Sequence, residues 1–184
     1  MRRKDKNDLV ALAMPTADGV FIARYSVKGL AGLTFPGSGR AGAPRAQCVA
    51  PAAVPQTIRR WHRAATAAVK RALAGRPPRL LPPLDLTRGT AFQQRVWSAL
   101  LNIPLGETRS YGELARMLRS PRAYRAVGGA CGANPIPLLV PCHRVLAAQH
   151  RLGGFSGGLK WKRLLLWREE AREWWPEKAT KKAE

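Results

Sequence analysis

The chain has 184 residues, enough for one compact domain or two small ones, and 46% of them are hydrophobic. It carries 32 lysines and arginines against 11 acidic residues, a formal net charge of +21 at pH 7. This composition argues against charge-driven disorder and predicts a polyanionic partner, most simply nucleic acid. No apolar run approaches the roughly 18 residues that a membrane span requires, so no membrane association is expected.

The three cysteines are Cys48, Cys131 and Cys142, an odd count without the spacing of a disulfide framework. The mixed-sign N-terminus leads into an apolar run, residues 9–14, that is too short for a secretory signal. We therefore expect a reducing, cytoplasmic location, associated with the nucleoid if the source is prokaryotic, and a monomer in solution.

The N-terminal part of the chain, residues 1–86, is predicted to be a small sheet-plus-helix domain. Residues 20–25 have the two-residue alternation of side chains that is typical of a β-strand. They follow an Asp18-Gly19 pair that suits a hairpin turn. A further strand is expected over residues 30–35, and these strands would form the sheet.

A loop and a helix complete this first domain. Residues 36–55 hold many Gly, Pro and Ala residues, which is typical of a loop. Apolar positions over residues 58–73 recur at helical spacing, and we expect this helix to stop at Gly75, before the proline-rich segment 77–83.

The second part of the chain, residues 87–174, is predicted to be mostly helical. Thr90 is expected to cap a helix whose apolar residues recur at three- and four-residue steps. Ser110 and Glu113 have capping-box spacing and predict a short helix that ends near Leu118.

Ser120 is expected to cap the next helix, with Pro121 at its first position. Its predicted inner positions are Ala123, Ala126, Val127, Ala130 and Cys131. Two short helices separated by a tight turn indicate a helix-turn-helix. A last helix is expected from about Leu159 to Trp174, and residues 175–184 are predicted to be a flexible tail.

Cys142 and His143 are the first candidates for chemistry. The thiolate is the reacting form of cysteine, and a neighbouring imidazole can lower the thiol pKa. In isolation, such a pair is more often a small buried cysteine beside a solvated histidine.

The surrounding sequence gives this pair a context. The informative blocks are residues 90–97 and 103–111, Arg125-Ala126-Val127-Gly128-Gly129-Ala130, Asn134-Pro135, Pro141-Cys142-His143-Arg144-Val145 and Gly154-Phe155-Ser156-Gly157-Gly158. In this order they closely resemble the O6-alkylguanine-DNA alkyltransferases, also called methylated-DNA–protein-cysteine methyltransferases. The resemblance is strong over residues 87–172 and weaker over residues 9–86.

The resemblance implies an α+β fold. Residues 1–86 would form a ribonuclease H-like accessory domain, and residues 87–174 a mostly helical domain with a winged helix-turn-helix-like DNA-binding motif. The implied function is DNA repair: O6-alkylguanine, and also O4-alkylthymine, is flipped out of the duplex, and its alkyl group passes irreversibly to Cys142. No cofactor is implied, and we expect no metal because Cys48 and His62 alone cannot build a four-ligand site.

The catalytic roles follow from the same resemblance. His143 would act as a base through a water molecule, and Glu169 would orient it. Tyr111 would donate a hydrogen bond to the leaving guanine, and Asn134 would tie the helix-turn-helix to the Cys142 segment. Without the resemblance, Glu169 would be interpreted as a surface glutamate, and Tyr111 as an aromatic residue of the core at the start of a helix.

The substrate pocket is also implied by the resemblance. Its expected residues are Ser156, which would contact O6; Val145, whose carbonyl would accept from the guanine amino group; Pro137 and Phe155 as apolar walls; and Cys131. Phe155 stands where many relatives have tyrosine, and residues 147–150 depart from the usual turn.

The second helix of the helix-turn-helix has few side chains that could distinguish bases. Its expected DNA-binding residues are Arg125, Ala126, Val127, Gly128, Gly129 and Ala130, together with Tyr111. Small residues allow a backbone to approach closely, which suits the minor groove of double-stranded DNA. Helix–helix packing would also explain them. Arg125 would enter the stack vacated by the flipped base, unless it is one more phosphate-facing arginine.

Two other functions remain open. A lesion-binding module would bind the alkylated base without removing the alkyl group, although relatives of that kind lack the cysteine. A general cysteine hydrolase would turn over repeatedly, but the basic surroundings and the small-residue helix would then have no role.

Overall fold

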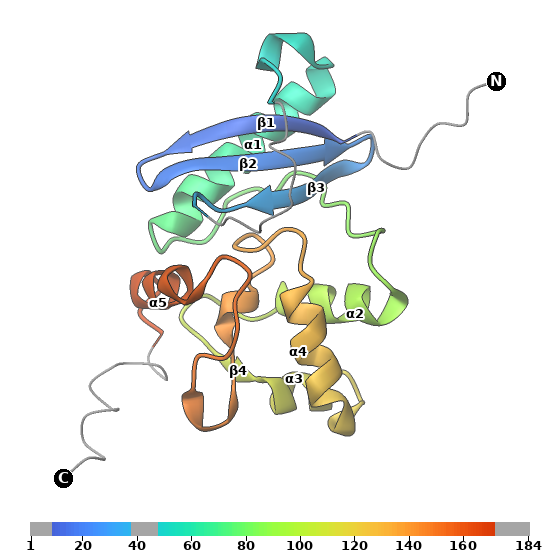
Figure 1. Ribbon diagram of the computed structural model, residues 1–184, viewed down its shortest axis with the longest axis vertical. Coiled ribbons are helices and arrows are strands. Elements are labelled where there is room, and N and C mark those ends of the chain that lie inside the picture. The colour runs from blue at the N-terminus through green and yellow to red at the C-terminus, as the bar shows by residue number, and fades with distance from the viewer. Residues whose placement is uncertain (1–8, 38–47, 172–184) are drawn as a thin grey trace.

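The computed structural model describes residues 9–37 and 48–171 of the chain (Figure 1). It has a mixed α/β architecture in which a small sheet lies toward one end of the long axis and most of the helices lie toward the other. Among the described residues, no helix is long and apolar enough to cross a membrane. The predicted tail, 175–184, lies outside the described residues.

The sheet has three antiparallel strands in the order β1-β2-β3: β1 Val10–Thr16, β2 Gly19–Ser26 and β3 Gly29–Thr34. The predicted hairpin is confirmed, with Thr16 paired to Gly19 across a two-residue loop. Gly19 has a φ of 114°, a conformation that side-chain-bearing residues rarely adopt, so the turn requires glycine there.

A short 3₁₀ turn, Pro51–Ala53, precedes the long helix α1, Gln56–Leu73, which packs against β1 and β3. The helix ends as predicted, because Gly75 takes a left-handed conformation, with a φ of 65°. The amide of Gly75 donates to the carbonyl of Ala72, and the amide of Arg76 donates to that of Arg71. A Cβ at Gly75 would lie 1.9 Å from the carbonyl oxygen of Arg168, so only glycine lets these segments meet.

The helical part begins with α2, Ala91–Leu100, followed by strand β4, Arg109–Ser110, helix α3, Tyr111–Met117, the 3₁₀ turn Pro121–Ala123 and helix α4, Tyr124–Gly132. Both capping predictions are confirmed: Thr90 with Gln93 and Ser110 with Glu113 form reciprocal capping boxes.

The prediction that Ser120 caps the following helix is wrong. Its hydroxyl donates to the carbonyl of Leu118, and a 3₁₀ turn lies between Ser120 and the start of α4. Of the predicted inner positions, Val127, Ala130 and Cys131 are buried, whereas Ala126 is exposed on α4 and Ala123 lies half-buried in the 3₁₀ turn.

The remaining elements are the 3₁₀ turn Cys142–Arg144, strand β5, Val145–Leu146, which pairs in parallel with β4, a further 3₁₀ turn, Ala148–His150, and helix α5, Leu159–Arg168. The predicted extension of α5 to Trp174 is wrong, because the helix ends at Arg168. Glu170 takes a left-handed conformation, and the amide of Ala171 donates to the carbonyl of Leu166, which closes the helix.

The two parts share one hydrophobic core. Phe21 and Phe35 of the N-terminal part pack against Trp161 of α5, and Phe35 also contacts Phe155. At the tip of the first hairpin, Asp18 forms a bidentate ion pair with Arg168, which lies at the end of α5. The sheet therefore packs against α5 and the loop before it and stabilises their position.

Candidate active site

Cys142 lies at the start of a 3₁₀ turn after a buried apolar segment, and only 3% of its surface is exposed. The side-chain amide of Asn134 donates to its Sγ (3.1 Å) and to the carbonyl of Val140 (2.8 Å). The Oδ1 of Asn134 accepts from the amide of Ile136 at 3.0 Å. Asn134 thus joins the end of α4 to the cysteine segment and is fully satisfied by these bonds.

Burial is the largest influence on the pKa of the Cys142 thiol. It raises the pKa of Cys142 to about 11, although the hydrogen bond from Asn134 and the charge of Lys162 act in the opposite direction. The resting thiol is therefore protonated at neutral pH. A reaction at this sulfur requires a base that removes its proton when the substrate is bound.

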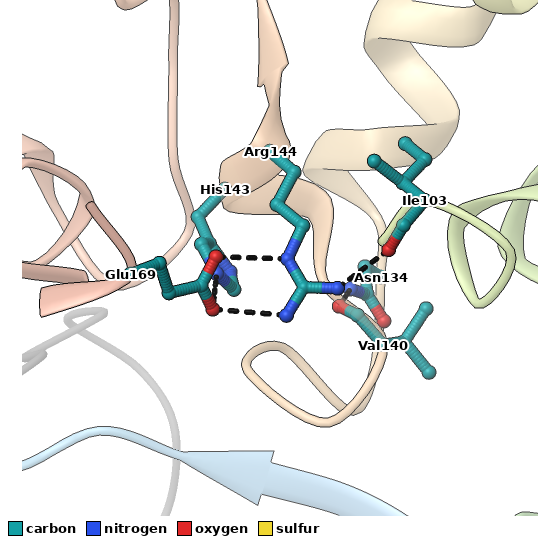
Figure 2. Close-up of polar contacts among 6 residues, drawn as sticks. All are labelled: Ile103, Asn134, Val140, His143, Arg144 and Glu169. Carbon is teal, nitrogen blue, oxygen red and sulfur yellow. Dashed lines mark hydrogen bonds and ion pairs between the residues drawn. The ribbon is translucent and has the colours of Figure 1, made fainter. Parts of the chain in front are cut away.

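His143 and Arg144 both bind the buried carboxylate of Glu169 (Figure 2). The Nε2 of His143 lies 2.9 Å from Oε1 of Glu169. Arg144 donates from Nε and Nη2 to the two carboxylate oxygens, each at 2.9 Å, and from Nη1 to the carbonyl of Ile103. This bidentate pair fixes the carboxylate against the imidazole.

The protonation states follow from these contacts. Burial acts to raise the pKa of Glu169, but the hydrogen bonds and charges of His143 and Arg144 outweigh it and lower that pKa to about 2. Burial lowers the pKa of His143, so its imidazole is neutral at pH 7. Because an ionised carboxylate only accepts, Nε2 carries the proton and Nδ1 is a free acceptor, without a partner among the described residues.

Tyr111 lies between α4 and the glycine-rich loop over residues 153–158. A Cβ at Gly128 would lie 3.9 Å from its ring, and a Cβ at Gly153 would lie 3.0 Å from its hydroxyl oxygen. Burial, reinforced by Cys131 and Cys142, raises the pKa of Tyr111 to about 12. The phenol therefore remains a proton donor at any physiological pH.

The loop beyond Gly153 contributes two further side chains. The hydroxyl of Ser156 is buried and has no hydrogen-bond partner among the described residues. The ring of Phe155 packs edge-on against both His143 and Phe35. An unpartnered buried hydroxyl beside an aromatic wall can receive a polar group of a ligand.

Comparisons with known proteins agree with this geometry. Residues 91–171 match the family model described as 6-O-methylguanine DNA methyltransferase, DNA binding domain. The crystal structure of Mycobacterium tuberculosis OGT in complex with DNA superposes with a TM-score of 0.71 and 38% identity, covering 88% of this chain and 93% of that one. The chain belongs to the O6-methylguanine-DNA methyltransferase family.

Other members of the family are similar too. The methylated-DNA–protein-cysteine methyltransferase of M. tuberculosis is 61% identical over 89 residues, which are 48% of this chain and 53% of that protein. The Haemophilus influenzae protein of the same name is 56% identical over 78 residues, 42% of this chain and 44% of that one. These matched segments thus span about half the length of the curated relatives. The methyltransferase from Pyrococcus kodakaraensis superposes with a TM-score of 0.59 at 26% identity, covering 88% of this chain and 98% of that one.

Within this family, the structure brings several predicted site residues together around Cys142. Asn134 contacts its sulfur directly, and Glu169 contacts its neighbour His143. Pro137 and Val145 are buried nearby in the chain, and Cys131 is buried on α4. The hydrogen bond from Asn134 to the sulfur was not anticipated, because only a backbone role was expected for this asparagine.

The structure places the residues of the predicted DNA-binding helix on two faces of α4. The side chains of Val127 and Ala130 are buried in the core, because they form the inner face of α4. The exposed residues of α4 include Arg125, Ala126 and Gly129, and a Cβ at Gly129 would meet only open space. The guanidinium of Arg125 lies 5.8 Å from the centroid of the Tyr124 ring, a cation–π contact.

Sequence reasoning missed Lys162, which is completely buried. Its ammonium donates to the carbonyls of Val145 (2.7 Å) and Leu152 and approaches that of Gly154 at 3.5 Å. Burial lowers the pKa of Lys162 to about 8, and its charge acts to lower the pKa of Cys142. A lysine at a helical position gives no local sign of such a role, since its partners lie on a distant strand and loop.

Two cavities of the described chain lie away from the thiol. A cavity of about 790 Å³ lies between the first hairpin and the ends of α1 and α5, and one of about 240 Å³ lies beside Arg144. Neither is lined by Cys142.

Proposed function

We propose that this protein repairs DNA by moving the alkyl group of O6-alkylguanine onto the sulfur of Cys142. The observation that carries this proposal is the set of contacts around the sulfur. A buried thiol accepts a hydrogen bond from Asn134, and the next residue, His143, is a neutral imidazole held through Nε2 by ionised Glu169. Its free Nδ1 is the base that such a thiol needs.

The proposed reaction balances as one displacement at carbon. A water molecule passes the thiol proton from Cys142 to Nδ1 of His143, and the sulfur attacks the alkyl carbon. The new carbon–sulfur bond forms as the bond from O6 to that carbon breaks. Tyr111 donates its phenolic proton to the departing guanine. The protonated imidazole of His143 then gives up the proton that it took from the thiol, and this proton restores the phenol. The thiol proton is thus in effect transferred to guanine.

The product is a thioether, which the groups around the sulfur have no means of hydrolysing. Each molecule would therefore act once, as a stoichiometric reagent. The same displacement could take an alkyl group from O4 of thymine, whose exocyclic oxygen would lie in the same place. We include O4-alkylthymine as a second substrate.

We propose that α3 and α4 form a winged helix-turn-helix-like motif that binds the minor groove of double-stranded DNA. The small exposed residues of α4, Ala126 and Gly129, would permit close approach of its backbone. Arg125 would fill the gap left by the extruded base, and its contact with the exposed ring of Tyr124 holds its guanidinium before DNA binds.

The proposed reaction also requires a route by which the extruded base reaches the buried thiol. The loop over residues 153–158 contains four glycines and carries Phe155 and Ser156. Movement of this loop away from Tyr111 would admit a base, and the unpartnered hydroxyl of Ser156 would then bind O6.

The larger organisation follows the same proposal. Residues 1–86 would be a ribonuclease H-like accessory domain and residues 87–174 the alkyl-transfer domain, with 175–184 as a tail. We propose a monomer that acts in the cytoplasm, at the nucleoid if the source is prokaryotic. The assigned substrate contacts also include the carbonyl of Val145, the ring of Pro137 and the side chain of Cys131.

A single-turnover assay tests the proposal. The protein is incubated with a duplex that contains O6-methylguanine, digested, and mapped by peptide mass. We expect one methyl group on the peptide that carries Cys142, and no transfer by Cys142→Ala. Cys48→Ala, which removes an exposed thiol outside the assigned substrate contacts, is the matched control and should still react. Methyl found on another residue, or a tight complex that leaves the lesion intact, would overturn the assignment.

A further inference from the structure

Helix α1 lies in a segment of the chain that carries only positive charges, and several of them are exposed on the helix. Residues 19–84 of the sequence contain eleven lysines and arginines and not one acidic residue. Arg59, Arg60 and Arg63 are exposed on α1, and Lys70 continues the same side of the helix toward its end. We call Arg59, Arg60, Arg63 and Lys70 the α1 basic face.

The α1 basic face is opposite the side of the helix that packs on the sheet. Ile58, Ala65, Val69 and Ala72 form the buried side. At 100° per residue, Arg59, Arg63 and Lys70 project within about 40° of one another, and Arg60 is adjacent. None of these four side chains forms a hydrogen bond or ion pair with another residue in the described part of the chain.

The start of α1 adds to this positive potential. Pro55 occupies the N-cap position, no side chain caps the helix, and its first turn contains no acidic residue. The free amides of that turn lie next to Arg59 and Arg60, where the helix dipole is positive. An anion at this end would therefore meet both fixed amide dipoles and mobile guanidinium groups.

This end of α1 is remote from the proposed DNA-binding helices. Figure 1 shows residues 51–58 at the top of the long axis, above the sheet, whereas α3 and α4 lie at the bottom. A duplex held by α4 in the minor groove would therefore lie at the opposite end of the molecule from the start of α1. We infer that the α1 basic face binds the phosphate backbone of a second segment of duplex DNA.

The dimensions and chemistry of the face favour nucleic acid. From Arg59 to Lys70 the helix rises about 16 Å, over which one DNA strand carries about five phosphates. An anionic membrane surface is the competing partner, but helices that bind membranes insert large apolar side chains. The large exposed apolar residues of the described chain lie elsewhere, none of them on α1. Backbone phosphates require only the charges, so binding should be independent of sequence.

The consequence is a protein that bridges two DNA segments. It could hold an undamaged segment while α4 engages another, which allows direct transfer between segments during a search for lesions. This inference rests on the proposed DNA binding by α4 for its first contact only. The second contact is a property of α1 alone.

A bridging assay separates the two contacts. Cys142→Ser protein, which cannot transfer a methyl group, is bound to an immobilised lesion duplex, washed, and exposed to a fluorescent undamaged duplex. We expect capture of the second duplex and its loss in the triple variant Arg59→Gln/Arg60→Gln/Arg63→Gln. The plot of log affinity for the second duplex against log salt should become shallower by up to about 2.7, at about 0.9 per lost phosphate contact.

The matched control is Lys28→Gln/Lys160→Gln/Arg163→Gln, which removes three exposed charges outside α1. It should retain capture. Equal loss in both triple variants, absence of capture by the parent protein, or capture of vesicles of anionic phospholipid in place of DNA would overturn the inference. Methyl transfer to Cys142, measured with the same triple variants in the reactive protein, reports on the proposed function separately. It should persist in both.

Discussion

Asn134 shows how one side chain can determine whether the thiol reacts. Across the described ranges, 9–37 and 48–171, its amide is the one side-chain group that donates a hydrogen bond to the sulfur, and it opposes the effect of burial on the thiol pKa. A hydrogen bond to a charged group stabilises it by about 1.5–3 kcal/mol. Burial keeps the resting thiol protonated, and its capacity to ionise depends on Asn134.

Asn134→Ala should raise the pKa of Cys142 further and slow methyl transfer by about 10- to 100-fold, the rate equivalent of that hydrogen bond. The measurement is the pH dependence of Cys142 alkylation by iodoacetamide, followed by peptide mass. Asn102→Ala, at an exposed asparagine after α2, should leave the profile unchanged. An unchanged profile for Asn134→Ala would show that the bond does not act on the thiol.

Glu169 is the second decisive residue. Glu169→Gln replaces the carboxylate with a neutral amide and leaves Arg144 without its charge partner. Breaking a buried ion pair lowers the free energy of unfolding by about 3–5 kcal/mol. The substitution also leaves His143 without the acceptor that fixes its tautomer. We expect both a lower melting temperature and a slower transfer, whereas Glu170→Gln, at the exposed neighbouring position, should change neither by much.

The pH dependence of stability gives an independent test of Glu169. Its pKa is lowered from the ordinary glutamate value of 4.5 to about 2. Its contribution to stability is therefore fully present above pH 4.5 and is lost as the pH falls toward 2. Denaturant titrations should show this acid-labile component in the parent protein and its reduction in Glu169→Gln. Identical acid profiles for the two proteins would contradict the ion-pair assignment.

At the scale of elements, the end of α5 fixes where Glu169 points. The helix stops because Glu170 adopts a φ of 51°, a conformation that costs a side-chain-bearing residue about 1 kcal/mol. The carbonyl of Arg168 packs against Gly75 in the same region. A strained turn and a glycine contact thus position the carboxylate of the preceding residue.

Glu170→Gly should stabilise the protein by about 0.5–1 kcal/mol, because glycine adopts this conformation freely while losing some of the gain to its flexible unfolded state. Glu170→Ala is the matched control, since it removes the same charge but keeps the Cβ. The difference between their unfolding free energies isolates the backbone effect. A Glu170→Gly variant no more stable than Glu170→Ala would refute it.

The same region marks the limit of prediction from sequence. The hairpin at Asp18-Gly19, the stop at Gly75, the cap at Thr90 and the capping box at Ser110 could be predicted, because each depends on residues within a few positions. The end of α5 could not, since glutamate is an uncommon residue for a left-handed helix end. The expected cap at Ser120 failed because the hydroxyl there binds the carbonyl of Leu118 instead.

The site itself shows a similar division. Cys142, His143 and Glu169 were identified through the family resemblance, and the structure joins His143 to Glu169. The roles of Arg144 and Lys162 depend on partners 8 to 41 residues away, Glu169, Ile103 and Val145 among them, and no local pattern records such pairings. Burial of Val127 and Ala130, in contrast, follows from helical spacing and was predicted.

At the scale of the whole molecule, one ion pair connects the sheet to the site. Asp18 and Arg168 are 150 positions apart, and the pair connects the first hairpin to the residue before Glu169. The hydrogen bond from Arg168 holds the pKa of Asp18 below its usual value. This contribution is present above about pH 3.8 and is lost in more acidic solution.

Asp18→Asn should reduce stability by about 0.5–1 kcal/mol, since both side chains are partly exposed to solvent. A double-mutant cycle with Arg168→Gln measures the coupling directly. Because the pair precedes Glu169 in the chain, its loss should also slow methyl transfer slightly. A coupling energy of zero would mean that the sheet supports α5 through its apolar contacts alone.

The central claim is that each molecule accepts one alkyl group and is then spent. It is tested most directly by titrating a fixed amount of O6-methylguanine duplex with protein and measuring restored guanine at completion. We predict a yield that rises linearly and reaches completion at one protein molecule per lesion. Restoration of several guanines by each molecule, or stoichiometric binding with no guanine restored, would contradict the claim.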